Sequence, residues 1–405
     1  MSWWHDADVD AWRALAAGMV GWMLDAFDVM LFALVLPSLS AELHITNAES
    51  GMLGSVMLVA AAAGGVASGR LADRYGRTRV LMSSIALYSV FTCLCGVATT
   101  LAQFVWLRVF LGIGMGGVWA SGAALVSESW PASSRGRALG LMQSGWAIGY
   151  GLAVFVAGIV QPRYGWRAVF FVGIVPALFA LWIQRRVREP EIWRRAAAEA
   201  PTETGFARLF TGDVAALTIV LTLMNACTLF GWWGFNLWLP SYLKSAPARG
   251  GAGLTGAATT GYLLLMQAGM WVGYVTFGFV SDRIGRKTSY VAYLLSAAVL
   301  LGLYVSIRQP MVLLALGPFV AFAATGYFSG FGAVTAEIYP TRIRATAQGF
   351  TYNIGRVASA AAPYLVGTLA DTHGFGAALL VCSAAFAIAA IFWAWIPETR
   401  GRTLA

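Results

Sequence analysis

The sequence predicts an all-α membrane protein with twelve transmembrane helices in two six-helix, pseudo-symmetric bundles. Of the 405 residues, 59% are hydrophobic and only 11% are charged, a composition that a soluble chain of this length could not hide from water. About twelve apolar runs reach the roughly 20 residues that span a bilayer. In addition, a charged motif recurs at a constant interval, which indicates that one half of the chain is a copy of the other.

The expected spans follow one another closely, apart from one polar segment at 185–212. This segment holds Pro190, Pro201 and several charges, and we expect it to be a cytoplasmic linker. It divides the chain into a first six-helix bundle, residues 1–184, and a second one, residues 213–405. The expected spans are 14–37, 51–71, 80–100, 102–127, 138–160, 168–184, 213–241, 257–280, 288–307, 309–336, 345–370 and 376–396.

The repeated motif lies between the second and third spans of each half. Asp73-Arg74-Tyr75-Gly76-Arg77 returns 209 residues later as Asp282-Arg283-Ile284-Gly285-Arg286, and an acidic and a basic residue follow at the same offset. We expect these charges to form a gate that holds one side of the membrane protein shut, or else to fix topology only. The gating candidates are Asp73, Arg74, Gly76, Arg77, Glu128 and Arg135, with their counterparts Asp282, Arg283, Gly285, Arg286, Glu337 and Arg344.

The stretch from Gly69 to Arg79, and its second copy from Gly278 to Lys287, resemble the loop signature of the major facilitator superfamily. The resemblance covers the whole chain, because the repeat, the helix count and the central linker all agree with it. It implies a fold of two six-helix bundles that rock about a central site and open alternately to each side of the membrane.

Basic residues predict the orientation of the chain. With the N-terminus inside, twenty of the 27 Lys and Arg residues lie in cytoplasmic segments and five in outer loops, so both termini should be cytoplasmic, in the inner cell membrane. The net charge of +9 follows from this bias and predicts no nucleic-acid partner. The four cysteines have no metal-site spacing, and we expect no cofactor or metal. Gly112-Ile113-Gly114-Met115-Gly116-Gly117 matches a dinucleotide fingerprint, but it follows no strand and is better explained by helix packing.

Charged residues inside the expected spans are the candidate functional groups, because charges within a membrane are costly and commonly mark a pathway. Asp25 and Asp28 lie midway along the first span, three residues apart and therefore on one helix face. A proton-coupled carrier needs such a carboxyl group, and the three histidines lie outside the membrane core. The alternative is a permanently ionised pair that holds helices together. Arg108, at a similar depth in the fourth span, is predicted to pair with Asp28, as a coupling group or as a structural salt bridge.

Arg356 lies near the middle of the eleventh span, where transporters bind their substrates. Its guanidinium needs an anion, and a substrate carboxylate could supply it through a bidentate pair; backbone carbonyls or an aspartate of the first half are the alternatives. Amide and aromatic side chains at similar depth are the candidate walls of the substrate pocket. These are Asn353, Tyr352, Gln143, Trp146, Asn236 and Gln267.

Two local motifs resemble a subgroup of the superfamily. Asp25-Ala26-Phe27-Asp28 is similar to the first-helix signature of proton symporters for organic acids, the lactate/sialate and aromatic-acid groups, although Val29 departs from their pattern. Asn353-Ile354-Gly355-Arg356 resembles organic-ion carriers, whereas the ending Pro397 to Gly401 resembles sugar porters.

The sequence therefore predicts a proton-coupled symporter that imports a small organic acid, a monocarboxylate, by alternating access. Its partners would be this acid, protons and the lipid bilayer, and a monomer suffices. The alternatives are a sugar:proton symporter and a proton-driven exporter of metabolites or drugs, although an exporter of lipophilic cations would not need Arg356. A nutrient sensor would need an output domain, which the short tail after Pro397 does not supply. An enzyme is not expected, since the sequence has no nucleophile–base or metal cluster.

Overall fold

The computed structural model describes residues 7–131, 135–191, 194, 209–212, 214–339 and 344–400. Within these ranges the regular elements are helices, and no strand is present in them. The chain forms two compact units, the first made of residues 1–35 and 56–202 and the second of residues 36–55 and 203–405. Most of the predicted linker at 185–212 lies outside the described residues, and α6 extends into its first two positions.

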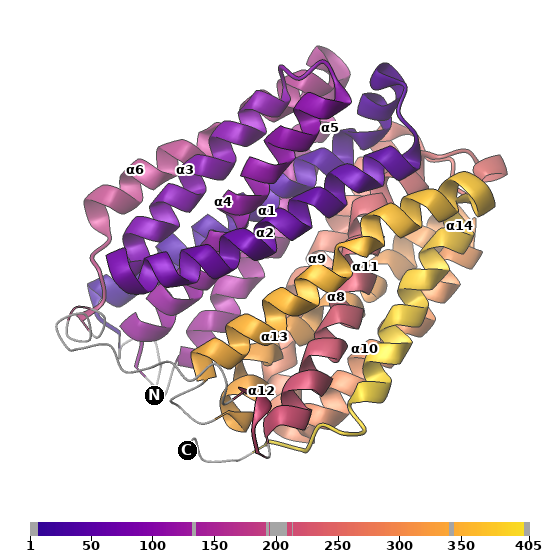
Figure 1. Cartoon of the computed structure of the whole chain (residues 1–405). Helices are drawn as coiled ribbons and strands as arrows, with labels where there is room; N and C mark the ends of the chain where they lie inside the picture. Colours follow the sequence, from indigo (N-terminus) through magenta and orange to yellow (C-terminus); the bar gives the residue numbers. More distant parts are fainter. Residues whose placement is uncertain are drawn as a thin grey trace. The chain divides into compact units, whose positions relative to one another are not determined.

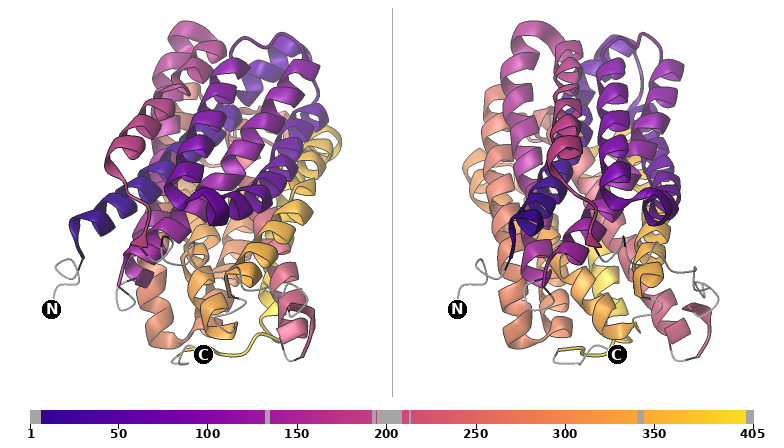
Figure 2. Two further views of the ribbon diagram at one scale, coloured as in Figure 1. Left: turned by 60° about the vertical axis from the view of Figure 1, so that its left-hand side comes forward. Right: turned by 90° about the vertical axis from the view of Figure 1, so that its left-hand side faces the viewer.

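The first unit is a bundle of long helices that run side by side (Figure 1; Figure 2). Helix α3 packs along α4 and α6, and it also touches α5. The helices of this half are α1 (Val9–Leu43), α2 (Asn47–Tyr75), α3 (Arg77–Cys95), α4 (Leu101–Ser129), α5 (Arg135–Val172) and α6 (Val175–Arg186).

The second unit contains the remaining helices, together with the end of α1 and the start of α2. Helix α8 packs against α13 and α14, and α9 packs against α11. The elements are α8 (Val214–Lys244), η3 (Pro247–Arg249), α9 (Gly256–Ile284), α10 (Arg286–Ser306), α11 (Pro310–Gly326), η4 (Tyr327–Gly330), α12 (Phe331–Ile338), α13 (Arg344–Ser359) and α14 (Ala361–Phe392).

The helices in the described part of the chain are consistent with the predicted twelve membrane spans. Ten helical segments of the described chain are long and apolar enough to cross a membrane, and two of these, 138–186 and 347–392, have 49 and 46 residues. Each is about twice the length of one span. Each contains a glycine in a non-helical conformation, Gly165 with φ 78° and Gly374 with φ 81°, so each comprises two spans. The predicted fold class is therefore confirmed.

The duplication extends to the backbone conformation of the turns. Gly76 and Gly285, which are 209 residues apart, have φ values of 113° and 99° and directly precede α3 and α10. An L side chain rarely adopts this region, so the turn requires glycine. Gly165 and Gly374, the turn glycines of the two longest segments, have the same separation.

Close helix packing explains the glycine-rich run of α4. A Cβ atom at Gly116 would overlap the carbonyl of Ala61 in α2, and one at Gly114 would lie 2.8 Å from the backbone nitrogen of Tyr88 in α3. The glycines thus let α4 approach α2 on one face and α3 on another. The interpretation of this run as a packing motif is confirmed.

Candidate functional site

The first repeated motif builds a charge cluster at the start of α3. Arg77 Nη2 lies 3.0 Å from Glu128 Oε1 at the end of α4, and both side chains are largely buried. Glu189, beyond the end of α6, accepts hydrogen bonds from the backbone N–H groups of Thr78 (3.1 Å) and Arg79 (3.2 Å). A carboxylate at this position stabilises the helix, because the first N–H groups of α3 have no partner within the helix. We call Arg77, Glu128 and Glu189 the first charge cluster.

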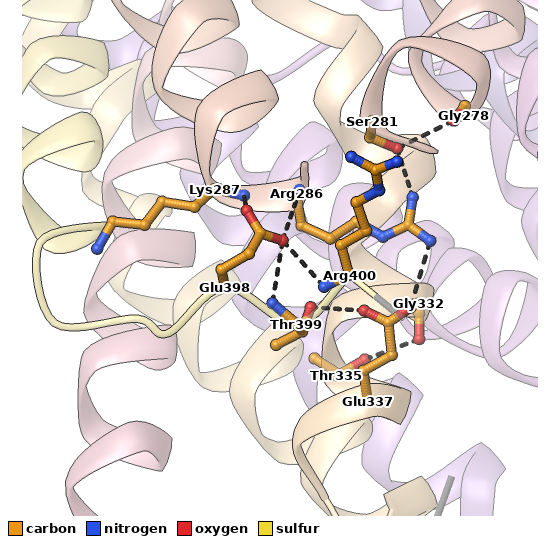
Figure 3. A network of polar contacts seen from close by, with 10 residues as sticks. All are labelled: Gly278, Ser281, Arg286, Lys287, Gly332, Thr335, Glu337, Glu398, Thr399 and Arg400. Carbon is orange, nitrogen blue, oxygen red and sulfur yellow. Dashed lines mark hydrogen bonds and ion pairs between the residues drawn. The ribbon is translucent and has the colours of Figure 1, made fainter. Parts of the chain in front are cut away.

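The second copy of the motif builds the same arrangement in the second unit (Figure 3). Arg286 Nη2 lies 3.2 Å from Glu337 Oε1. Glu398 accepts hydrogen bonds from the backbone N–H groups of Arg286 (2.8 Å) and Lys287 (3.1 Å) at the start of α10. The hydroxyl of Thr399 donates to Glu337 at 2.5 Å, which ties the two carboxylates together. We call Arg286, Glu337, Glu398 and Thr399 the second charge cluster.

The backbone around Glu398 stabilises its charged form. Burial alone would raise the pKa of this carboxyl, but the N–H groups of Arg400, Arg286, Lys287 and Thr399 together hold its pKa below the ordinary value. Hydrogen bonds to a carboxylate favour the ionised state, because they are lost when the group is protonated.

Sequence reasoning identified two residues of each charge cluster. It named Arg77, Glu128, Arg286 and Glu337, but it missed Glu189 and Glu398. Those two residues are also 209 apart, so the same offset would have found them. Gly76 and Gly285 lie directly against the two missed carboxylates. The backbone carbonyl of Arg283 accepts a hydrogen bond from Arg400 at 2.8 Å. The side chains of the remaining gating candidates, Asp73, Arg74, Arg135, Asp282 and Arg344, lie outside the described part of the structure.

The two aspartates of α1 are fully buried in the first unit. Asp28 faces α3, where Thr92 and Tyr88 are the polar groups that interact with its carboxyl. Among the described residues, neither carboxylate oxygen of Asp28 has a hydrogen-bond partner within normal distance. A buried carboxyl in such surroundings is suited to change its protonation state rather than to remain a permanently solvated charge.

Arg108 is also fully buried, but it contacts a different part of α1. Its Cζ lies 4.1 Å from the centroid of the Phe32 ring, and Nη2 donates to Met57 Sδ at 2.8 Å. Its Nε and Nη1 have no hydrogen-bond partner among the described residues. The predicted direct pair between Asp28 and Arg108 is therefore not formed in this structure. Phe32 is four residues after Asp28, so the guanidinium lies about one helical turn further along α1.

The remaining candidates of the first unit lie on α5. Gln143 Oε1 accepts a hydrogen bond from Trp119 Nε1 of α4 at 3.2 Å. Trp146 packs against Trp22 of α1 with ring centroids 4.5 Å apart. Trp22 is three residues before Asp25, so this aromatic pair lies beside the aspartates on α1.

Arg356 of α13 is 2% exposed in the second unit. Its Cζ lies 5.0 Å from the centroid of the Tyr352 ring, one turn earlier on the same helix. Within the described residues its Nε has no hydrogen-bond partner, and its guanidinium forms no ion pair. Asn353 donates to the carbonyl of Gly349 at 3.0 Å. A buried guanidinium beside an aromatic ring is a cation in need of an anion.

Further polar and aromatic candidate side chains belong to α8, α9 and η4 of the same unit. Asn236 donates to the carbonyl of Trp232 at 3.0 Å, while Gln267 Oε1 is buried without a hydrogen-bond partner among the described residues. The ring of Trp232 lies 6.3 Å from that of Phe328, in the 3₁₀ segment η4 that interrupts the tenth span. Such interruptions commonly mark functional hinges. Sequence reasoning missed Asn225, whose buried Nδ2 also has no described partner.

Comparisons with known proteins agree with this architecture. The Major Facilitator Superfamily model matches residues 18–247 and 221–404. The chain is 34% identical over 376 residues to a cis,cis-muconate transport protein of Acinetobacter baylyi, which covers 91% of this chain and 90% of the relative. It is 29% identical over 388 residues to a sialic acid transporter of Escherichia coli, with 95% and 94% covered. The crystal structure of a D-xylose-proton symporter superimposes with a TM-score of 0.77 at 20% identity, covering 98% of this chain and 100% of that one. The chain belongs to the major facilitator superfamily, and it is a multi-pass membrane transporter rather than an enzyme.

Proposed function

We propose that the protein is a proton-coupled symporter that imports a small organic acid, a monocarboxylate, by alternating access. The observation that carries this proposal is Arg356, a buried guanidinium that no carboxylate pairs with among the described residues. Binding of a substrate carboxylate would supply the missing negative charge, with two parallel N–H···O bonds. The rings of Tyr352 and Trp232 offer an apolar surface for the body of the acid.

Asp28 is the proposed proton carrier, with Asp25 beside it on the same face of α1. The fully buried carboxyl of Asp28 accepts no hydrogen bond from the described residues, so its ionised form is costly in the closed first unit. When this part of the protein opens to water, the carboxyl can take up or release a proton. Arg108 would then stabilise the ionised form from its position over Phe32, without a direct ion pair.

Symport follows if both sites must be neutralised before the carrier changes conformation. An empty carrier buries the charge of Arg356, and an unprotonated carrier buries that of Asp28. In a carrier loaded with an acid anion and a proton, the charge of Arg356 is paired and Asp28 is neutral. This loaded carrier therefore changes conformation more easily. The two charge clusters would stabilise the closed state of their side, because they connect the starts of α3 and α10 to distant parts of their own units.

The test is uptake driven by a pH gradient in proteoliposomes, with labelled lactate, benzoate, cis,cis-muconate and xylose. We expect accumulation of a carboxylate, its loss in Arg356→Ala, and partial retention in Arg356→Lys, since lysine keeps the charge without the bidentate geometry. Arg308→Gln removes an exposed cation of another loop and should leave uptake unchanged. Accumulation of xylose alone, unaffected by Arg356→Ala, would refute the acid-symport proposal.

A sugar:proton symporter is the second candidate. The ending from Pro397 to Gly401 resembles that of sugar porters, and its Glu398 organises the second charge cluster. The same uptake panel separates the two candidates. In both cases we propose a monomer in the cytoplasmic membrane with both termini inside, as the distribution of basic residues predicts.

A further inference from the structure

The second unit contains a polar cavity that the proposed substrate site does not include. Its volume is about 870 Å³, and it lies between the end of α1, the end of α8 and the turn at Gly374. His373, in its wall, is seventeen residues after Arg356 along the same span, which corresponds to about 25 Å of helix. The cavity is lined by Leu36, Pro37, Ser40, Ala41, Ile45, Thr46, Asn47, Ser241, Ser245, Ala248, Arg249, Gly250 and residues 370–375. The basic-residue distribution predicts that this end of the helices faces outward.

A rigid loop presents Arg249 to this cavity. The loop after α8 is fixed by backbone hydrogen bonds from Gly253 to Ser245 (2.8 Å) and from Leu254 to Leu243 (2.8 Å). Gly250, in the left-handed region at φ 73°, packs against the backbone of Phe375. Arg249 forms no ion pair with the described residues, so its positive charge is available to an anion in the cavity.

The cavity wall already contains one bound carboxylate. Asp371 of α14 accepts a hydrogen bond from Asn47 Nδ2 at 2.6 Å and another from the backbone N–H of Ala48 at 3.1 Å. Both donors belong to the first turn of α2, and a helix N-terminus attracts anions. Asp371 thus occupies a position that suits a carboxylate, in the same cavity that Arg249 lines.

The side chain of Ser241 lines another wall of the cavity. Ser241 of α8 is 5% exposed, and its Oγ makes no hydrogen bond with the described residues. Most serine hydroxyls in the helices of this protein donate to a carbonyl three or four residues earlier, as Ser306 does. Ser241 therefore adds a hydrogen-bond donor to the cavity from α8, whereas Asn47 and Asp371 belong to α2 and α14.

Helices α2 and α14 approach each other closely near Asp371, and the polar bonds described between them are those that Asp371 accepts. A Cβ atom at Gly51 of α2 would overlap the carbonyl of Pro363, and one at Gly367 of α14 would overlap the carbonyl of Asn47. The two helices therefore touch backbone to backbone over this stretch. The hydrogen bonds that Asp371 accepts from Asn47 and Ala48 connect the two helices at the end of this stretch.

We propose that this cavity is a first docking site for the carboxylate of the transported acid, and that docking releases the contact between α2 and α14. The incoming carboxylate pairs with Arg249 and accepts a hydrogen bond from Ser241. It competes with Asp371 for Asn47 and Ala48, so that its arrival opens this end of the second unit. The substrate class rests on the function proposed above, but the site itself does not depend on Arg356.

Two variants of the cavity should change uptake kinetics in opposite directions. Arg249→Gln should raise the KM for the transported acid about fivefold, the factor of an exposed ion pair, without changing the maximal rate. Asp371→Asn removes the competing carboxylate and should lower the KM. Arg308→Gln and Asp10→Asn are the matched controls, because they remove one cation and one acid that do not line the cavity. Equal KM values in all four variants would overturn the proposal.

Occupancy can be measured separately from transport. In Ser245→Cys, modification by a membrane-impermeant sulfonatoethyl thiosulfonate reagent reports on the cavity. We expect lactate, benzoate or cis,cis-muconate to slow the modification, also when Arg356→Ala has abolished uptake, and xylose to have no effect. The protection should disappear in Arg249→Gln. Absence of protection by any acid that wild-type protein transports would refute the docking site but leave the proposed function intact. Protection without acid uptake would refute only the function.

Discussion

The guanidinium of Arg108 lies over the ring of Phe32, with its Cζ 4.1 Å from the ring centroid, one turn of α1 beyond Asp28. This cation–π contact and the bond to Met57 hold the arginine beside the buried carboxyl instead of against it. Among the described residues, Asp28 and Arg108 therefore form no direct ion pair.

The contact between Arg108 and Phe32 should be measurable as a coupling energy. A double-mutant cycle of Phe32→Leu and Arg108→Gln, followed by thermal unfolding in detergent, should give a coupling of about 0.5–2 kcal/mol. The same cycle with Phe91→Leu, whose ring stacks on Phe110, should give a coupling near zero. Equal values for both cycles would mean that Arg108 gains nothing specific from Phe32.

Asp28→Asn should abolish accumulation against a gradient. An amide cannot release a proton, so uptake should no longer respond to a pH difference, whereas exchange of labelled for unlabelled substrate continues. Fluxes in proteoliposomes with and without a pH gradient measure this. Asp25→Asn is the comparison, and we expect it to keep part of the pH-driven accumulation. Undiminished accumulation in Asp28→Asn would remove this residue from proton coupling.

Glu398→Gln should destabilise the protein by about 0.5–1 kcal/mol at pH 7, the usual contribution of an anion at a helix N-terminus. The pKa of Glu398 is lower in the folded state than in the unfolded chain. Its contribution is therefore complete above the unfolded pKa, about 4.3, and is lost as the pH falls through the folded pKa.

Thermal unfolding of wild type and Glu398→Gln at several pH values checks this sign. The difference between them should shrink below pH 4 and approach zero in stronger acid. Glu189→Gln, at the equivalent position of the first charge cluster, should cause a comparable loss at pH 7. A difference that grows on acidification would contradict the assignment of the stabilising form to the carboxylate.

Gly116→Val should destabilise the first unit severely, by about 1–3 kcal/mol or more, because its side chain would collide with the backbone of α2 at Ala61. Gly140→Ala is the control, since a Cβ atom there meets no neighbour within 4 Å. Melting temperature and the yield of folded protein measure the effect. If Gly116→Val were as stable as wild type, the glycine-rich run of α4 would need another explanation.

The sequence by itself determined the membrane fold and its duplication. Apolar runs of span length leave few alternatives in a bilayer, because every backbone polar group must be paired within a helix. The offset of 209 residues also predicted which side chains of the two halves are equivalent. Arg77 and Arg286 are such a pair, and each forms an ion pair with the equivalent glutamate of its own unit. The buried charges Asp28, Arg108 and Arg356 were identified for the same reason, since a charge inside an apolar run is conspicuous.

Only the tertiary structure decided what these side chains touch. The sequence predicted Asp28 and Arg108 at a similar depth in the membrane. In the structure, Arg108 lies one turn of α1 further along, and its guanidinium therefore contacts the ring of Phe32 instead of the carboxylate of Asp28. Likewise, nothing local in the sequence connects Asp371 with Asn47, which are 324 residues apart. Such contacts depend on how backbones approach at Gly51 and Gly367, and this approach is set by the packing of whole helices and not by the periodicity of any one of them.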